Sequence, residues 1–443
     1  ATLTAPLMHP VDVRIHHWFV PFRVIWDDWD DFITGKTEPT FPTVTYTNGS
    51  SPYTLVDHLG IPDSTMTVSA LPIRAYNKIY NDFYRDQDLI TEVTEDSLVL
   101  QRIAWEKDYF TSCRASPQQG TAITIPFATG TDAPVKGIGA IDTGTPTATS
   151  GTGDDFIDAV GTFGDASDDA WVIPMTDVKM KMKQSGVPSA SNRPQVFADL
   201  SNVTGGGIDI NDFRLSLAMQ RHLEARNRYG TRFQDYLAYH GIKPRDGRLD
   251  IAEYLGGGKQ VISFSEVLAT ADSGTAEVGD LAGHGISAVR TRRYGRFFPE
   301  SGIVMSLMSV RPRTIYAEQL DRFWLRNDKD DFWQKEYEEM GPQSVLTKEV
   351  YGPHGNSTDV FGYNGRHDEY RHHPSRVSGD FRNSTSYNWH LARILGSSPT
   401  LNQSFVECAP TDRVYADGTA PEILAMVSHD LKAKRLVRKK AKY

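Results

Sequence analysis

Glycine-rich and histidine-rich positions are where this chain could carry out chemistry, but none completes a known catalytic pattern. The run GGGKQ at 256–260 superficially resembles a phosphate-binding loop. That loop needs a glycine five residues before its second glycine, and a serine or threonine after its lysine to bind the metal of a nucleotide. Here those positions hold Glu253 and Gln260, so we predict no phosphate loop. The nucleophile-elbow, zinc-protease and EF-hand patterns are also absent from the sequence.

Two pairs of adjacent histidines, His16–His17 and His372–His373, come closest to metal ligands by residue type. Adjacent side chains on a strand point to opposite faces of the sheet, so such a pair suits one shared metal ion poorly. The aspartates at 27, 28, 30 and 31 could attract a divalent cation, but a solvated helix face is the better interpretation. We therefore predict no metal site, no cofactor and no enzymatic activity. Carboxylate pairs that cleave glycosides are spaced in three dimensions, so the sequence leaves that alternative open.

The basic C-terminal tail, residues 429–443, is the clearest chemical signal. It holds seven lysines or arginines against one aspartate, a net charge of about +6 on a chain whose formal net charge is −9. Such clusters bind phosphate backbones by releasing counterions, and aromatic rings can stack on unpaired bases. The alternative is a solvated tail, although Leu431, Leu436 and Val437 would let it anchor on protein. We predict DNA binding by Lys432, Lys434, Arg435, Arg438, Lys439, Lys440 and Lys442.

The segment Val11–Ile33 is the element with the clearest pattern, and we expect it to be structural. Alternating β-branched and aromatic residues from Val11 to Val20 predict a strand. Pro21 ends it, because proline has no N–H to give a sheet ladder. Tryptophans and isoleucines then recur at helical spacing with aspartates between them, which predicts a short acidic helix that Gly35 stops.

Apolar residues at helical spacing predict three further helices. They span 72–84 with proline in the first turn, 209–229 with Asp209 as its cap and Gly230 as its end, and 233–240. Further strands are expected at 122–127, 261–268, 302–310, 405–406 and 423–427. The strand at 302–310 is apolar throughout, so we expect it to be buried on both faces. A basic segment with four arginines, at 290, 292, 293 and 296, precedes it.

Composition bounds the remaining possibilities. Residues 128–170 contain eight acidic residues and one basic residue, Lys136, among Gly, Thr and Ala, so we predict an exposed insertion at 128–205. The two cysteines, Cys113 and Cys408, are too few for a disulfide framework and should be buried free thiols. No run of eighteen apolar residues occurs in the 443, so we expect no membrane insertion. Scattered strands with long, partly helical connections favour a β-sandwich with large loops.

Nine stretches from residue 6 to about 393 carry a family resemblance. They read PLMHPVDVRIHHWFVPFRVIWDDWDDFITG, LPIRAYNKIYNDFYRDQ, KDYFTSCRASPQQG, RNRYGTRFQDYLAYHGIKPRDGRLDIAEYLGGGKQVISFSEVL, AGHGIS, MSVRPRTIY, DRFW, FGYNGRHDEYRHHPSRVSGDFR and WHLAR. Each is weak alone. Together, and in this order, they resemble the major capsid protein of the Microviridae, small icosahedral single-stranded DNA bacteriophages, and most closely its gokushovirus-like branch.

The resemblance implies a mainly β fold, an eight-stranded viral jelly roll with long loop and helical insertions, as a single domain over residues 1–443. It implies sixty copies closing a T=1 icosahedral shell around a circular single-stranded DNA genome, with outer loops for attachment to a host receptor. Minor capsid, spike or DNA-binding viral proteins would be further partners. The protein would assemble in the bacterial host cytoplasm and reside in the virion. Family members have an upstream segment with an early barrel strand, and we expect this chain, which starts at Ala1, to begin after it.

A rival function from another class fits the same composition. It is a non-viral β-sandwich that binds or cleaves glycans. Particle size in solution separates the two hypotheses, because a shell forms a megadalton particle whereas the glycan protein stays a monomer.

Overall fold

The computed structural model describes most of the chain outside one long central stretch. The described residues are 2–47, 54–62, 64–121, 123, 135–136, 197–198, 210–230, 232–242, 250–268, 281–338, 340–418 and 422–435. The chain divides into a larger unit, residues 1–121 with 221–443, and a smaller unit, residues 122–220. In the smaller unit two short strands, β4 (Val135–Lys136) and β5 (Phe197–Ala198), pair antiparallel.

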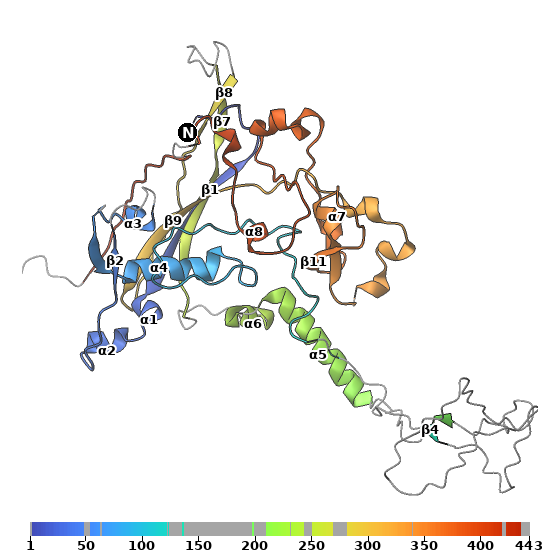
Figure 1. Cartoon of the computed structure of the whole chain (residues 1–443). Helices are drawn as coiled ribbons and strands as arrows, with labels where there is room; N and C mark the ends of the chain where they lie inside the picture. Colours follow the sequence, from blue (N-terminus) through green and yellow to red (C-terminus); the bar gives the residue numbers. More distant parts are fainter. Residues whose placement is uncertain are drawn as a thin grey trace, which may run out of the picture. The chain divides into compact units, whose positions relative to one another are not determined.

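A three-stranded antiparallel sheet is the centre of the larger unit (Figure 1). Its middle strand β1 (Val11–Pro21) lies between β6 (Glu253–Val261) and β9 (Gly302–Pro312). The strand predicted from alternating residues is confirmed, with Pro21 as its last residue. Strands β1 and β9 pair along their whole length, from Val11 opposite Pro312 to Pro21 opposite Gly302.

The glycines of the GGGKQ run lie inside strand β6, not in a phosphate loop. A bulge shifts the register of β6 against β1 between His17 and Trp18, and Gly256 adopts a φ of +141° there. A Cβ on Gly257 would lie 2.2 Å from the carbonyl oxygen of Ile15 on β1. Only glycine permits so close an approach of the two backbones. The run is therefore explained by strand packing.

Three two-stranded antiparallel sheets complete the β structure described for the larger unit. Their strands are β2 (Thr43–Tyr46) with β3 (Met66–Ser69), β7 (Ser263–Leu268) with β8 (Leu281–Ile286), and β10 (Gln343–Leu346) with β11 (Val360–Asn364). The unit is thus β-rich, with small antiparallel sheets and several helices. Among the described residues no sheet exceeds three strands, so the finer prediction of eight strands in a jelly roll is taken up below as a proposal.

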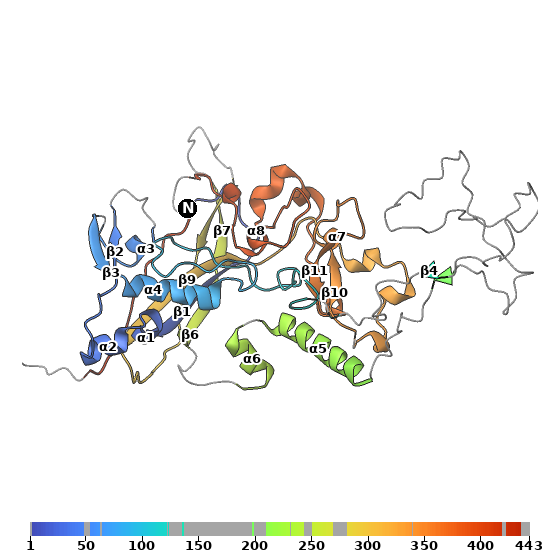
Figure 2. The same ribbon diagram turned by 60° about the horizontal axis from the view of Figure 1, so that its bottom comes forward.

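Helix α4 (Leu71–Ile79) covers one face of the central sheet, and both views place it against β1 and β9 (Figures 1 and 2). It continues as a π-helical turn, η1 (Tyr80–Tyr84), so the helix predicted at 72–84 is confirmed. Its Ile73 and Ile79 are fully buried against Trp18 and Val20 of β1. The burial of this amphipathic face supplies the main stabilisation of the helix.

The acidic segment after β1 forms two short helices where one was predicted. They are α1 (Phe22–Ile25) and α2 (Trp29–Thr34), and Gly35 ends α2 with a φ of +69°. Trp26, the first of the three residues between them, has an extended backbone and is buried. Helix α3 (Leu55–His58) packs Leu55 into the same core.

Helices α5 (Ile210–Tyr229) and α6 (Phe233–Tyr239) confirm two further predictions. Gly230 and Gly241 follow them with positive φ angles, as expected for residues that end helices. The predicted cap at 209 lies outside the described residues. None of the described side chains of α5 is buried.

A second core lies around β10 and β11 and is built largely from aromatic side chains. It includes Tyr109, Phe110, Tyr316, Phe361 and Phe405. A third, smaller cluster of buried residues includes Leu3 and Val414. The remaining helices of the larger unit are short. They are α7 (Thr347–Val350), α8 (Gln403–Val406), η4 (Arg322–Leu325), η5 (Lys329–Asp331), η6 (Lys335–Tyr337), η7 (Asp368–Arg371), η8 (Gly379–Arg382), η9 (Ser384–Trp389) and η10 (Asp412–Val414).

The strand predicted at 302–310 is confirmed as β9, but its predicted burial and two other strand predictions were wrong. Strand β9 is not buried on both faces, because Val304 and Met308 are 41% and 44% exposed. Residues 405–406 belong to helix α8, and residues 423–427 form no described strand. The strand predicted at 122–127 lies outside the described residues except for Ile123. Cys113 and Cys408 are buried and free, as predicted.

Candidate functional site: a groove with basic rims

The face of the central sheet opposite helix α4 forms the floor of a large groove of about 3330 Å³. Alternation along β1 places Val13, Ile15, His17 and Phe19 on this face, and their partners on β9 are Val310, Met308, Ser306 and Val304. Each pair lies side by side across the two strands, so the floor is mostly apolar. Among the side chains that alternate with them, Trp18 and Val20 of β1 and Met305 of β9 belong to the core beneath α4. Nothing in the sequence pattern distinguished these two faces.

One rim of the groove is the basic segment after β8, residues 287–301. It runs along strand β6, where the backbone N–H of Arg292 donates to the carbonyl oxygen of Gly257 at 3.3 Å. The side chains of Arg290, Arg292 and Arg293 are exposed, and none has a carboxylate partner among the described residues. Arg296 instead forms an ion pair of 2.7 Å with a glutamate of β6. This rim therefore presents three positive charges that no described carboxylate pairs with.

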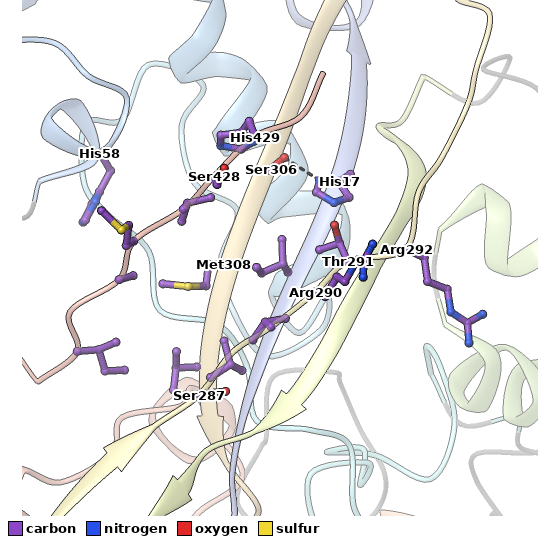
Figure 3. A pocket seen from close by; sticks show the side chains of 18 of the residues that line it. His17, His58, Ser287, Arg290, Thr291, Arg292, Ser306, Met308, Ser428 and His429 are labelled. Atoms are coloured by element: carbon purple, nitrogen blue, oxygen red, sulfur yellow. Dashed lines mark hydrogen bonds between the residues drawn. The ribbon is translucent and has the colours of Figure 1, made fainter. Parts of the chain in front are cut away.

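The other rim is the extended segment 422–435, which ends in Lys432, Lys434 and Arg435. Figure 3 shows Ser428 and His429 of this segment across the groove from Arg290 and Arg292. All three basic side chains at its end are exposed. The other predicted DNA-binding residues lie outside the described residues; they are Arg438, Lys439, Lys440 and Lys442.

His17 is the titratable side chain at the centre of the floor (Figure 3). Its Nδ1 and the Oγ of Ser306 are 2.7 Å apart, and its ring centroid lies 5.2 Å from that of Tyr294. Burial, together with the nearby His429, lowers the pKa of His17 below its ordinary value of 6.5. The ring is therefore neutral at pH 7, so it offers the groove an aromatic surface and adds no charge.

The arginine rim was recognised in the sequence as basic but was not predicted to be part of a site. A usable signal was present, because the arginines alternate with Tyr294, Phe297 and Phe298. Phe297 is 83% exposed, whereas Phe298 packs against Phe19 of the floor with ring centroids 4.4 Å apart. Cations interleaved with aromatic rings are typical of surfaces that bind unpaired nucleic acid or protein partners. The tertiary structure places this segment in the lining of the same groove as Lys432, Lys434 and Arg435 of the predicted tail.

The pair His16–His17 behaves as the strand geometry predicted, whereas His372 and His373 follow η7 and lie in no strand. His16 lies on the face opposite His17, where its Nδ1 is 2.8 Å from the hydroxyl of Tyr84. His372 stacks on Tyr109, with ring centroids 4.9 Å apart. In the described part of the chain, no three His, Cys, Asp or Glu side chains lie close enough together to hold a metal ion. No helix within those residues has the length and apolar character needed to cross a bilayer.

Known proteins with similar sequences share one description. Residues 1–439 match the sequence profile of a family described as Capsid protein (F protein). The chain is 33% identical over 437 residues to Capsid protein VP1 of Bdellovibrio phage phiMH2K, which covers 92% of this chain and 80% of that protein. It is 29% identical to Capsid protein VP1 of Chlamydia phage 1, in an alignment that covers 96% of this chain and 85% of that protein. It is 28% identical to Capsid protein VP1 of Spiroplasma virus 4, with 92% of this chain and 80% of that protein covered.

Proposed function

Because the chain belongs to the Microviridae capsid proteins of the Capsid protein (F protein) family, we propose that sixty copies of it form a T=1 icosahedral shell around a circular single-stranded DNA genome. Family membership itself makes the chain a major capsid protein, a structural component of the virion that assembles in many copies. The observation that carries the proposal is the match over residues 1–439, because it spans nearly the whole chain. Closed symmetry turns modest contacts between copies into a stable particle.

The proposed fold of residues 1–443 is a single jelly roll with eight strands and long insertions, and the protein has no enzymatic activity. The long antiparallel pairing of β1 with β9 and the open apolar floor support this fold, because a second sheet packs on such a floor in a sandwich. Residues 128–205 are the proposed exposed insertion. Their position supports this, since the smaller unit 122–220 interrupts the larger one in sequence. The outer loops would meet a host receptor and other viral proteins, after assembly in the host cytoplasm.

The basic tail, residues 429–443, would contact the packaged DNA. Lys432, Lys434 and Arg435 support this role, because all three are exposed and extend from one rim of the groove. Exposed cations release counterions when they bind phosphates, so the affinity for single strands falls with salt at a slope of about −0.7 per contact. Neutralising three contacts should therefore reduce the salt slope by about 2.

The shell and its DNA contact can be tested separately. Light scattering and electron microscopy of the purified chain should reveal a megadalton particle, and a persistent monomer would contradict the shell. For the DNA contact, the variant Lys432→Ser/Lys434→Ser/Arg435→Ser should lose DNA per particle and show the smaller salt slope on single-stranded DNA. A matched control neutralises three exposed cations elsewhere, Lys36, Lys335 and Arg371. Equal DNA content in the tail variant and the control would exclude the tail as a DNA contact.

A further inference from the structure

A second hollow, hereafter the arginine pocket, lies in the larger unit apart from the groove, and no residue lines both. Its walls are the last turns of helix α5, the segment before β10 and the segment that runs from β11 into η7. Five arginines line it against three carboxylates. Its volume of about 1070 Å³ is close to the upper end of the range for small-ligand sites, about 300–1,000 Å³.

Aromatic rings with exposed surface stand in the wall of the arginine pocket. Trp333 and Tyr370 are 49% and 50% exposed. The indole N–H of Trp333 donates to Glu338 at 2.9 Å, and the Tyr370 hydroxyl accepts from the backbone N–H of Trp333 at 3.1 Å. Arg326 lies over the Tyr370 ring at 4.5 Å, so Trp333 offers the more open ring. A ring that is fixed and exposed can stack on an unpaired base at little cost in conformational entropy.

His367 is a side chain of the arginine pocket that lacks a partner. Both of its ring nitrogens are buried without a hydrogen-bond partner among the described residues, and its side chain is only 11% exposed. Its Nδ1 lies 3.9 Å from a carboxylate oxygen of Glu369, too far for a hydrogen bond. Its φ is +60°, which residues other than glycine rarely adopt. Buried polar atoms without partners, on a strained backbone, are typical of a site that a ligand completes.

Two arginines of the arginine pocket can hold an anion. The guanidinium of Arg228 lies over Gly365, where a Cβ would be 3.2 Å from one of its nitrogens. Arg366 donates from Nε to a backbone carbonyl oxygen at 3.2 Å. Neither has a carboxylate partner among the described residues, whereas Arg371 is paired with Asp368 at 2.6 Å. Guanidinium groups bind phosphates through charge-assisted hydrogen bonds.

We propose that the arginine pocket binds one unpaired nucleotide of single-stranded DNA. The base stacks on Trp333 and hydrogen-bonds to His367, and the phosphate lies on Arg228 and Arg366. An imidazole donates from one nitrogen and accepts at the other, which matches the donors and acceptors on the edge of an unpaired base. The inference rests on the proposed function, because the packaged genome supplies the nucleotide. The basic tail would bind phosphates whatever the base, whereas the arginine pocket requires a base.

A peptide segment of a second copy is the other occupant to consider. Arginine and aromatic side chains are also enriched where proteins bind each other. The arginine pocket favours a nucleotide, because one small ligand must place an anion, a flat ring and hydrogen-bonding groups in the same hollow. The experiments below include the peptide as an outcome.

Binding of an oligonucleotide to the full chain tests the stacking contact. The probe is a fluorescent, unstructured single strand of about eight nucleotides, followed by anisotropy. Trp333→Ala should weaken binding by about tenfold, whereas Trp333→Phe keeps a ring and should stay within about threefold of the native chain. The control Trp324→Ala removes a ring that is 68% exposed outside the arginine pocket, and it should bind as the native chain does.

The polar contacts have separate signatures. Arg228→Ser/Arg366→Ser should reduce the salt slope by about 1.4, the value for two phosphate contacts with a single strand. His367→Phe removes both ring nitrogens and should weaken binding by about two- to tenfold. On a probe with abasic sites, the native chain and His367→Phe should bind equally, because the base contact is then missing in both.

Ultraviolet crosslinking tests the contact in assembled particles. Irradiation of native particles that contain DNA, followed by peptide mapping, should place a crosslinked nucleotide on Trp333 or Tyr370. The exposed Trp324 should carry none.

The outcomes separate this inference from the proposed function. A native chain that neither assembles nor binds the probe overturns both. Native particles that package DNA overturn only the arginine pocket if Trp333→Ala binds the probe as tightly as Trp324→Ala does. If Trp333→Ala binds the probe normally but fails to assemble, a segment of a second copy occupies the arginine pocket and the inference is wrong.

Discussion

Replacing Gly257 by alanine tests whether close backbone packing, and not a ligand, explains the glycine run of β6. The new Cβ would lie 2.2 Å from the carbonyl oxygen of Ile15. A carbon and a carbonyl oxygen normally approach to about 3.3–3.6 Å, so the two strands must separate by about 1 Å. A hydrogen bond stretched by that amount exceeds the usual limit of about 3.2 Å.

The expected cost follows from these displacements. Losing about two ladder hydrogen bonds costs about 1–3 kcal/mol, and the strain of overpacking adds about 1–3 kcal/mol. Alanine also restricts the unfolded chain more than glycine does, and this adds about 0.4–1 kcal/mol to the free energy of unfolding. We therefore expect Gly257→Ala to lower the free energy of unfolding by about 1–6 kcal/mol.

Urea denaturation followed by tryptophan fluorescence measures this difference. The matched control is Gly355→Ala, because no atom lies within 4 Å of its added Cβ and its φ is not positive. The control should be neutral or more stable by up to about 1 kcal/mol. The explanation of the glycine run fails if Gly257→Ala is as stable as Gly355→Ala.

Three further predictions concern buried groups. Burial lowers the pKa of His9 below 6.5, so the unfolded chain takes up a proton on this ring before the folded chain does, and stability falls as the pH drops below about 6.5. The variant His9→Gln should therefore show a smaller change of the urea midpoint between pH 7 and 5.5. An unchanged slope would exclude His9 as a source of this pH dependence. Glu349→Ala leaves the mostly buried Arg322 without its carboxylate and should lower the free energy of unfolding in urea by about 3–5 kcal/mol. The control Asp31→Ala breaks a largely exposed ion pair and should lower it by only about 0–1 kcal/mol. Equal losses in the two variants would contradict the argument from burial. Burial raises the pKa of the Cys113 thiol, and it raises the pKa of the Cys408 thiol to about 12. Neither thiol should therefore react with a thiol reagent at pH 8 until the chain is unfolded. Rapid labelling of the native chain would contradict this prediction.

Local periodicity was enough to predict the elements whose patterns are long. The strand at Val11–Val20 and the helices at 72–84 and 209–229 each have ten or more residues of one period, and the structure confirms them. Residues 405–406 were too short to assign, because two adjacent apolar residues fit a strand and a helical turn equally well. The apolar run of β9 predicted burial on both faces, but a run of apolar residues does not say what covers each face.

For the candidate site, the sequence alone determined which residues carry charge and which family the chain resembles. A cluster of lysines and arginines is positive wherever it lies, so the tail Lys432–Lys442 could be predicted as a DNA contact, which stays a proposal. Only the tertiary structure placed Arg290–Arg293 and Lys432–Arg435 in the lining of one groove, although more than 130 residues separate them in the sequence. Tertiary structure also decided that one face of β9 stays open, since burial depends on which segments pack there and no local pattern records that.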